Sequence, residues 1–166
     1  MITGTTSTAS GSDLFPGSRI APTAALLAAS LAVRDAFEHV VNRPMGLDRE
    51  VADLIVRISL AGEAGLRGVD CARQLHVSAT QVSRLADRAE SAELVERKPD
   101  PYDRRAQRLL LTQIGEQTAR TLAPLVDAAI QAMIFDEFDA RERAALISLL
   151  DRLTKQASRL VETATP

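Results

Sequence analysis

The residues best suited to chemistry in this chain lie between Val77 and Gly115, where hydroxyl, amide and guanidinium groups precede a charged turn. Within seven residues, at the start of one amphipathic segment, the sequence places Ser78, Thr80, Gln81, Ser83 and Arg84. Side chains of these types hydrogen-bond the edges of bases and the oxygens of phosphates. The cluster therefore predicts contact with nucleic acid. A solvated helix face is the alternative, and the basic segment that follows weighs against it.

A second group of cations follows in residues 97–108, which hold five basic residues against two acidic ones. The basic residues are Arg97, Lys98, Arg104, Arg105 and Arg108. The whole chain, in contrast, carries a formal net charge of −2. A small basic face on an acidic protein supports a local nucleic-acid site and weakens non-specific binding.

Both groups need a scaffold, and the pattern around them predicts one. Val69–Leu75 forms a short helix, and a second helix runs from Ser78 to about Ala92 behind an S-x-x-Q capping box. The strand-like segments Leu94–Lys98 and Arg108–Leu111 flank a turn-rich stretch. A helix-turn-helix followed by a β hairpin can place one helix in the major groove with the hairpin beside it. Its predicted inward residues are Cys71, Ala72, Leu75, Val77, Val82, Leu85 and Ala89.

The remaining chain predicts long helices. One runs from Pro22 to about Asn42, one follows an Asp48 cap, one runs from Thr112 to about Ile134 with a kink at Pro124, and the last follows a D-x-x-E capping box at Asp139. The fold class is mainly α with a small β wing. We expect a disordered tail at 1–21, helical dimerisation regions at 22–46 and 112–162, and a DNA-binding lobe at 47–111. Because the outer helices carry more apolar surface than one helix can cover, a homodimer is favoured over an intrachain bundle.

Several other classes are not supported by the sequence. No apolar run reaches about 18 residues and no secretory signal opens the chain, so we expect no membrane contact and a cytoplasmic location. His39 and His76 are far apart, and Cys71 is the single cysteine, so no metal site or cofactor is expected. The sequence also shows no phosphate loop, nucleophile elbow or paired catalytic carboxylates. The protein is therefore not expected to be an enzyme.

Two motifs in this region resemble those of the MarR family of winged helix-turn-helix transcription regulators. The wing motif D-x-R, five residues, L-T, two residues, G corresponds here to Asp103, Arg105, Leu111, Thr112 and Gly115. The recognition-helix motif corresponds to Ser78, Ser83, Arg84, Leu94, Val95 and Arg97. The resemblance in layout covers residues 24–162, and its motifs lie within 72–115.

The resemblance implies roles for these side chains. Arg105 is similar to the wing-tip arginine that enters the minor groove, and Asp103 to the acid that positions the wing by ion pairing. Thr80, Gln81, Ser83 and Arg84 resemble the contacts in and beside the major groove. Arg97, Lys98 and Arg104 are expected at phosphates, and Ser78 and Arg88 complete the predicted DNA-binding set. The partner would be a near-palindromic operator in double-stranded DNA.

The resemblance further implies a repressor that a small aromatic or phenolic effector releases from DNA. The effector would bind between the DNA lobe and the dimer helices, where His39, Arg43, Asp53 and Arg57 are the candidate contacts. A surface or packed position for His39 and an ordinary i, i+4 ion pair for Asp53 and Arg57 are the alternatives.

The sequence departs from the family pattern at two turns. Glu93 and His76 stand where the family often has Gly, so both positions are expected to need a positive φ or a different turn. Two other functions remain open at this point. One is a helical adaptor that binds protein through the same scaffold, and the other is a thiol-based oxidation sensor that uses Cys71 between subunits. Cys71 as a buried small hydrophobe is the alternative to the sensor.

Overall fold

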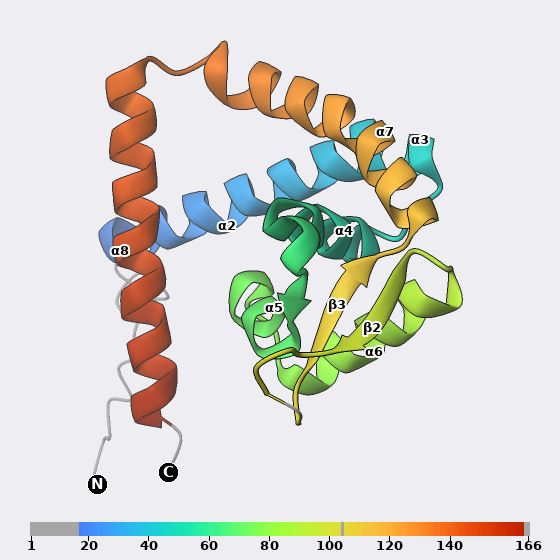
Figure 1. Ribbon diagram of the computed structural model, residues 1–166. Coiled ribbons are helices and arrows are strands. Elements are labelled where there is room, and N and C mark those ends of the chain that lie inside the picture. Colours follow the sequence, from blue (N-terminus) through green and yellow to red (C-terminus); the bar gives the residue numbers. More distant parts are fainter. Residues whose placement is uncertain (1–16, 104, 165–166) are drawn as a thin grey trace, which may run out of the picture.

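The computed structural model describes residues 17–103 and 105–164, and confirms a mainly helical protein with a small β wing (Figure 1). The first half contains α2 (Gly17–Phe37), the π-helical turn η1 (Glu38–Asn42), α3 (Arg43–Met45), α4 (Arg49–Ala61), the 3₁₀ turn η2 (Gly62–Ala64) and β1 (Leu66–Arg67). The second half contains α5 (Gly68–Leu75), α6 (Ala79–Ser91), β2 (Val95–Pro99), β3 (Gln107–Leu111), α7 (Gln113–Ile130), the π-helical turn η3 (Gln131–Phe135) and α8 (Ala140–Ala164). A lobe of α4, α5, α6 and the sheet lies below α2 and α7, and α8 stands to one side (Figure 1).

The sheet has three antiparallel strands in the order β1-β3-β2. β2 and β3 form the predicted hairpin, with Val95 opposite Leu111 and Pro99 opposite Gln107. β1 was not predicted, because two residues are too short to show an alternating pattern. It pairs with the inner strand and places Arg67 directly opposite Arg108.

The core of the lobe is built around α4. Leu54, Ile55 and Ile58 of this helix are at most 1% exposed and pack with Leu122 of α7. All seven predicted inward residues of the helix-turn-helix join this core: Cys71, Val82, Leu85 and Ala89 are buried, and Ala72, Leu75 and Val77 are partly buried against it. The helix-turn-helix therefore packs on α4, which in turn packs on α7.

Three helices start at the side-chain N-caps that the sequence predicts. Asp48 Oδ1 accepts the backbone N–H groups of Glu50 and Val51 at 2.9 and 3.2 Å. Ser78 and Gln81 form the capping box of α6, and Asp139 and Glu142 exchange the same contacts at α8. These caps satisfy N–H groups that a helix leaves unpaired in its first turn.

The outer helices differ from expectation at their ends. α2 begins at Gly17, so residues 17–21 are helical rather than part of the predicted tail, and residues 1–16 lie outside the described residues. The first helix also does not stop before Pro44. Pro44 has no N–H to donate one turn back, and the chain widens into the π turn η1 before α3 ends at Gly46. α7 continues through Pro124, and its departure from α geometry comes later, at η3.

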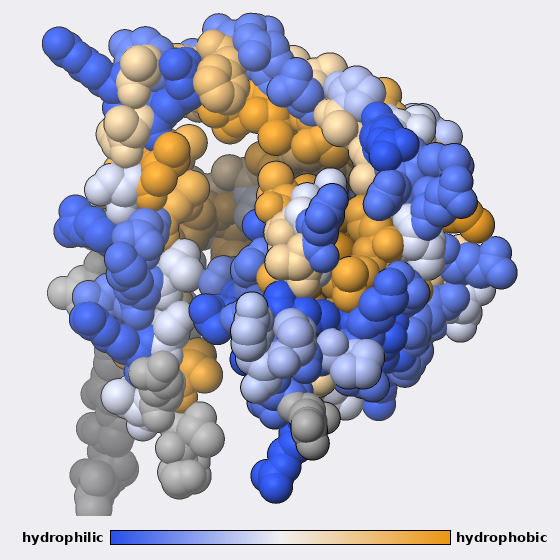
Figure 2. Space-filling model, in the orientation of Figure 1, coloured by the Kyte–Doolittle hydropathy of each residue, from blue (hydrophilic) through white to orange (hydrophobic). Residues whose placement is uncertain are grey.

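Much of the outer helices is apolar and uncovered. By length and composition alone, the helical segment Ile20–Met45 could cross a membrane, with a mean hydropathy of 1.4, although charged residues interrupt it. Buried core helices of soluble proteins and N-terminal signal sequences meet the same criteria, and none of the 18-residue window that meets them here is buried within the described chain. In α8, every side chain described beyond Leu146 is exposed. Hydrophobic residues border the opening between α8 and the rest of the molecule (Figure 2).

The two turns that depart from the family pattern do adopt positive φ. His76 ends α5 with a φ of 53°, and Glu93 follows α6 with a φ of 57°. This prediction is confirmed. The left-handed region costs a residue with a Cβ about 1–2 kcal/mol, so both turns store strain that glycine would avoid.

Glu93→Gly is therefore expected to raise the free energy of unfolding by roughly 0.5–1 kcal/mol, after the extra chain entropy of glycine is subtracted. Urea denaturation followed by circular dichroism measures the change. Ala92→Gly is the matched control, because the neighbouring Ala92 has a φ of −89° and gains nothing from glycine. Equal losses in both variants would contradict the strain at Glu93.

Candidate nucleic-acid interface

The helix-turn-helix presents a polar face on α6. Thr80, Gln81 and Arg84 are exposed there. Gln81 Oε1 accepts the backbone N–H and the hydroxyl of Ser78, both at 2.9 Å, which leaves its amide nitrogen for an outside acceptor. Arg84 has no hydrogen bond or ion pair within the part of the chain that the structure describes. An unpaired guanidinium in the first half of a recognition helix is suited to guanine or phosphate.

Two other predicted DNA contacts, Arg88 and Arg97, form ion pairs within the lobe. Arg88 bonds Asp48 and Glu50 at the start of α4, at 3.2 and 2.5 Å. Arg97 of β2 bonds Glu90, and also reaches Asp87 at 2.8 Å and the Ser83 carbonyl at 3.2 Å. These contacts fix α6 to α4 on one side and to the hairpin on the other. The sequence did not reveal these ion pairs, because folding alone brings the acidic partners next to the arginines.

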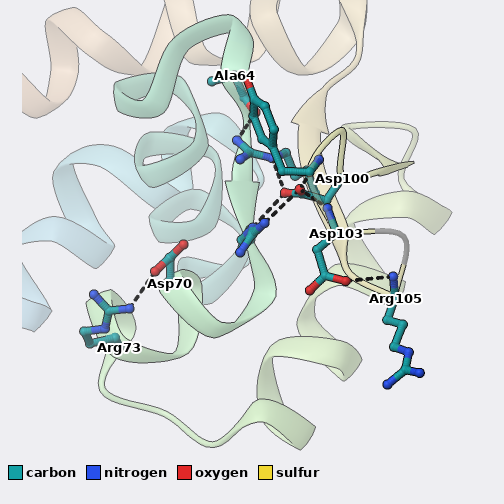
Figure 3. Close-up of polar contacts among 9 residues, drawn as sticks. Ala64, Asp70, Arg73, Asp100, Asp103 and Arg105 are labelled. Carbon is teal, nitrogen blue, oxygen red and sulfur yellow. Dashed lines mark hydrogen bonds and ion pairs between the residues drawn. The ribbon is translucent and has the colours of Figure 1, made fainter.

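The hairpin presents Arg105 to solvent. Its backbone N–H donates to Asp103 Oδ1 at 3.0 Å, and its side chain extends away from the hairpin (Figure 3). Within the described residues the guanidinium has no partner. Lys98 pairs with Glu96 at 2.6 Å, and Arg104 lies outside the described residues. Arg105 is thus free to contact a ligand.

An unpredicted acid, Asp100, lies at the base of the hairpin. Its side chain is fully buried and bonds Arg67 and Arg108. The Arg67 guanidinium and the backbone N–H groups of Tyr102 and Asp103 hold the pKa of Asp100 well below its usual range, against the effect of burial. The predicted wing-positioning acid, Asp103, makes no ion pair within the described residues. The structure gives the ion pairing to Asp100, three residues earlier.

The four candidate effector contacts do not converge. His39 Nδ1 lies 2.8 Å from the Asp35 carbonyl, and Arg43 lies 3.9 Å from Glu38. Asp53 pairs with Arg49 at 3.7 Å rather than with Arg57, and burial raises its pKa despite both arginines. Asp53 alone of the four lines the cavity of about 510 Å³ between α4 and the helix-turn-helix.

Cys71 is positioned as a core residue. It is fully buried, and burial raises the pKa of its thiol to about 11. Oxidation requires an accessible thiolate, so the packing opposes a sensor at this position. In the described residues, moreover, no group of three or more His, Cys, Asp or Glu residues could hold a metal ion.

The helix-turn-helix and the hairpin face one hollow. A cavity of about 570 Å³ between α6 and the hairpin is lined by Ala79 and Ser83 from the helix and by Arg105 and Gln107 from the hairpin. The fold and this shared face define a winged helix-turn-helix protein. A family model of the MarR family matches residues 45–106, which span this unit. Over these residues the chain matches the MarR family.

Solved structures show the same fold over most of the chain. AbsC, a MarR family transcriptional regulator from Streptomyces coelicolor, is 22% identical with a TM-score of 0.72, covering 92% of this chain and 99% of that one. Sco3205 from the same organism, in complex with DNA, is 20% identical with a TM-score of 0.73 over 89% of each chain. CouR from Rhodococcus jostii RHA1, bound to p-coumaroyl-CoA, is 22% identical with a TM-score of 0.66, covering 80% and 88%. Comparison with curated proteins gives no match.

Proposed function

We propose that the protein is a cytoplasmic, homodimeric transcription regulator that binds a near-palindromic operator and has no enzymatic activity. The observation that carries the proposal is the pair of exposed, unpartnered arginines: Arg84 on the recognition helix, and Arg105 on the wing, which lines the hollow between that helix and the hairpin. Arg84 would read the major groove or its phosphates. Arg105 would enter the adjacent minor groove, whose negative potential favours arginine. The solved complex of Sco3205 with DNA supports this use of the fold.

A second copy of the chain is the partner we propose for α8. The leucine stripe of this helix repeats at spacings of four and three: Leu146, Leu150, Leu153, Ala157 and Leu160. Leu150 and Leu153 are 41% and 47% exposed, and further apolar residues of α2 remain uncovered. An apolar repeat with this spacing is typical of a helix that packs against another helix. In a two-fold dimer, the same stripe from each copy would cover the apolar border seen in Figure 2.

A repressor released by a small molecule is the finer part of the proposal. CouR is solved with p-coumaroyl-CoA, so a structure of this fold accommodates an organic ligand. For this chain, an aromatic or phenolic effector would bind between the lobe and the dimer helices and favour one spacing of the two lobes. A candidate space there is the cavity of about 520 Å³ between α4 and α7, lined by Val56, Leu60 and Ile130 among others.

Selection of bound DNA from a random pool, with the purified full-length protein, tests the proposal directly. A two-fold-symmetric site bound by a dimer, with half-sites about 10 bp apart, is the expected result. Enrichment of no site, with only weak binding that salt abolishes, would overturn it and favour the protein-binding adaptor.

Arg84→Ala is expected to weaken binding to the selected operator by about 1–3 kcal/mol if Arg84 reads a base. Fluorescence anisotropy with the operator and with a scrambled duplex separates base reading from phosphate contact. Loss of a base contact lowers affinity for the operator only, whereas loss of a phosphate contact lowers affinity for both duplexes. Arg73→Ala is the matched control, since Arg73 is an exposed arginine of the same lobe that pairs with Asp70. Unchanged operator binding by Arg84→Ala would remove the residue from the interface.

A further inference from the structure

We propose that Asp100 is the positioning residue of the wing, and that it sets the place from which Arg105 reaches DNA. The inference rests on the proposed function, since it assigns how the DNA site is held in shape. Asp100 itself is buried and touches no ligand surface. Its effect on DNA would therefore pass entirely through the hairpin.

Five hydrogen bonds converge on the Asp100 carboxylate. Oδ2 accepts Arg67 Nε at 2.7 Å and Arg108 Nε at 2.6 Å. Oδ1 accepts Arg67 Nη2 at 2.8 Å and the backbone N–H groups of Tyr102 and Asp103 at 2.8 and 3.0 Å. A carboxylate offers about four lone-pair sites, so this group is saturated. It connects β1, β3 and the wing turn at a single point (Figure 3).

The two arginines require that carboxylate. Arg67 and Arg108 stand directly opposite each other across β1 and β3. Like charges in that position repel and weaken a strand pair. Because Asp100 lies between them, the repulsion becomes attraction, and the short strand β1 stays paired with the wing.

The contacts continue from Asp100 to Arg105 and, in the other direction, to α4. The Asp100 N–H donates to the Ala106 carbonyl at 3.0 Å, and Asp103 accepts the Arg105 N–H, so the turn that carries Arg105 is closed on both sides. Arg108 Nη1 also donates to the Ala64 carbonyl at 2.8 Å. The wing is thereby tied to the turn that ends α4, and its position follows that of the lobe.

A double-mutant cycle in operator binding tests the assignment. Asp100→Asn keeps the size of the side chain and removes the charge. We expect it to weaken binding about tenfold in the wild-type background and less than twofold in Arg105→Ala, because its effect passes through Arg105. Hydroxyl-radical footprinting should show lost protection in the flanking minor groove with the major-groove contact retained.

Asp70→Asn is the matched control, since it also removes an acid bonded to an arginine, Arg73 at 2.6 Å, but at an exposed site (Figure 3). It should leave affinity within twofold in both backgrounds. Equal loss from Asp100→Asn in both backgrounds, or an unchanged footprint, would overturn the inference. If Asp100→Asn does not fold, Arg67→Lys replaces it in the same double-mutant cycle, because lysine keeps the charge but cannot form the bidentate contact with Asp100. Failure of the wild type to bind any DNA would instead overturn the proposed function.

Discussion

Leu153→Glu is expected to convert the proposed dimer into a monomer. In an isologous interface the substitution acts twice, once on each copy, and each copy loses the burial of one leucine, worth roughly 1.5–3 kcal/mol. It also brings two carboxylates to one apolar seam, where neither finds a counter-charge. The combined loss of at least about 4 kcal/mol corresponds to a dissociation constant raised about a thousandfold.

Sedimentation velocity over a range of concentrations measures this shift. Leu60→Glu is the matched control, because Leu60 is 78% exposed on α4 and lies outside the α8 stripe. The control should remain a dimer. If Leu153→Glu also remains a dimer, α8 is not the interface. A monomer that still folds should bind one half-site weakly and lose the cooperative recognition of a two-fold operator.

The sequence predicted the helix-turn-helix and the hairpin well because their signals are local. The capping pair Ser78 and Gln81, and the turn residues between the strands, determine structure within a few residues of themselves. The missed features depend on tertiary contacts. β1 is two residues long and exists only because β3 lies beside it. The continuation of the first helix past Pro44 depends on the π turn that precedes it.

The same division applies to the site. Arg84 was predicted from residue type and position, and Arg105 from its resemblance to the family's wing-tip arginine. The structure leaves both free of partners within the described residues. Arg88 and Arg97 have the same side-chain chemistry, but folding brings acids from α4 and α6 against them. Asp100 was missed because its partner Arg67 lies 33 residues away in sequence. A sequence shows which side chains are capable of binding DNA, and packing decides which of them remain available.

Gly115 is the position where the smallest substitution should have the largest effect on stability. It lies in the first turn of α7, where its N–H donates to Thr112 Oγ1 at 3.0 Å, and the Leu94 carbonyl lies directly against its Cα. A Cβ at this position would overlap that carbonyl oxygen, which is backbone and also accepts the Thr112 N–H at 3.1 Å. The glycine of the family motif is therefore explained by close packing of α7 on the start of the wing.

Gly115→Ala must displace either the cap of α7 or the chain that enters β2, and we expect a loss of about 3 kcal/mol in the free energy of unfolding. Gly68→Ala supplies the control, because a Cβ there meets nothing within 4 Å and the first position of α5 should gain slightly from alanine. Urea denaturation of both variants measures the difference. Since Gly115 lies where the wing passes into α7, Gly115→Ala should also lower operator affinity at temperatures at which the protein remains folded. A loss below 1 kcal/mol in the free energy of unfolding would show that α7 can move away from Leu94 at little cost, so that the connection between the wing and α7 is flexible.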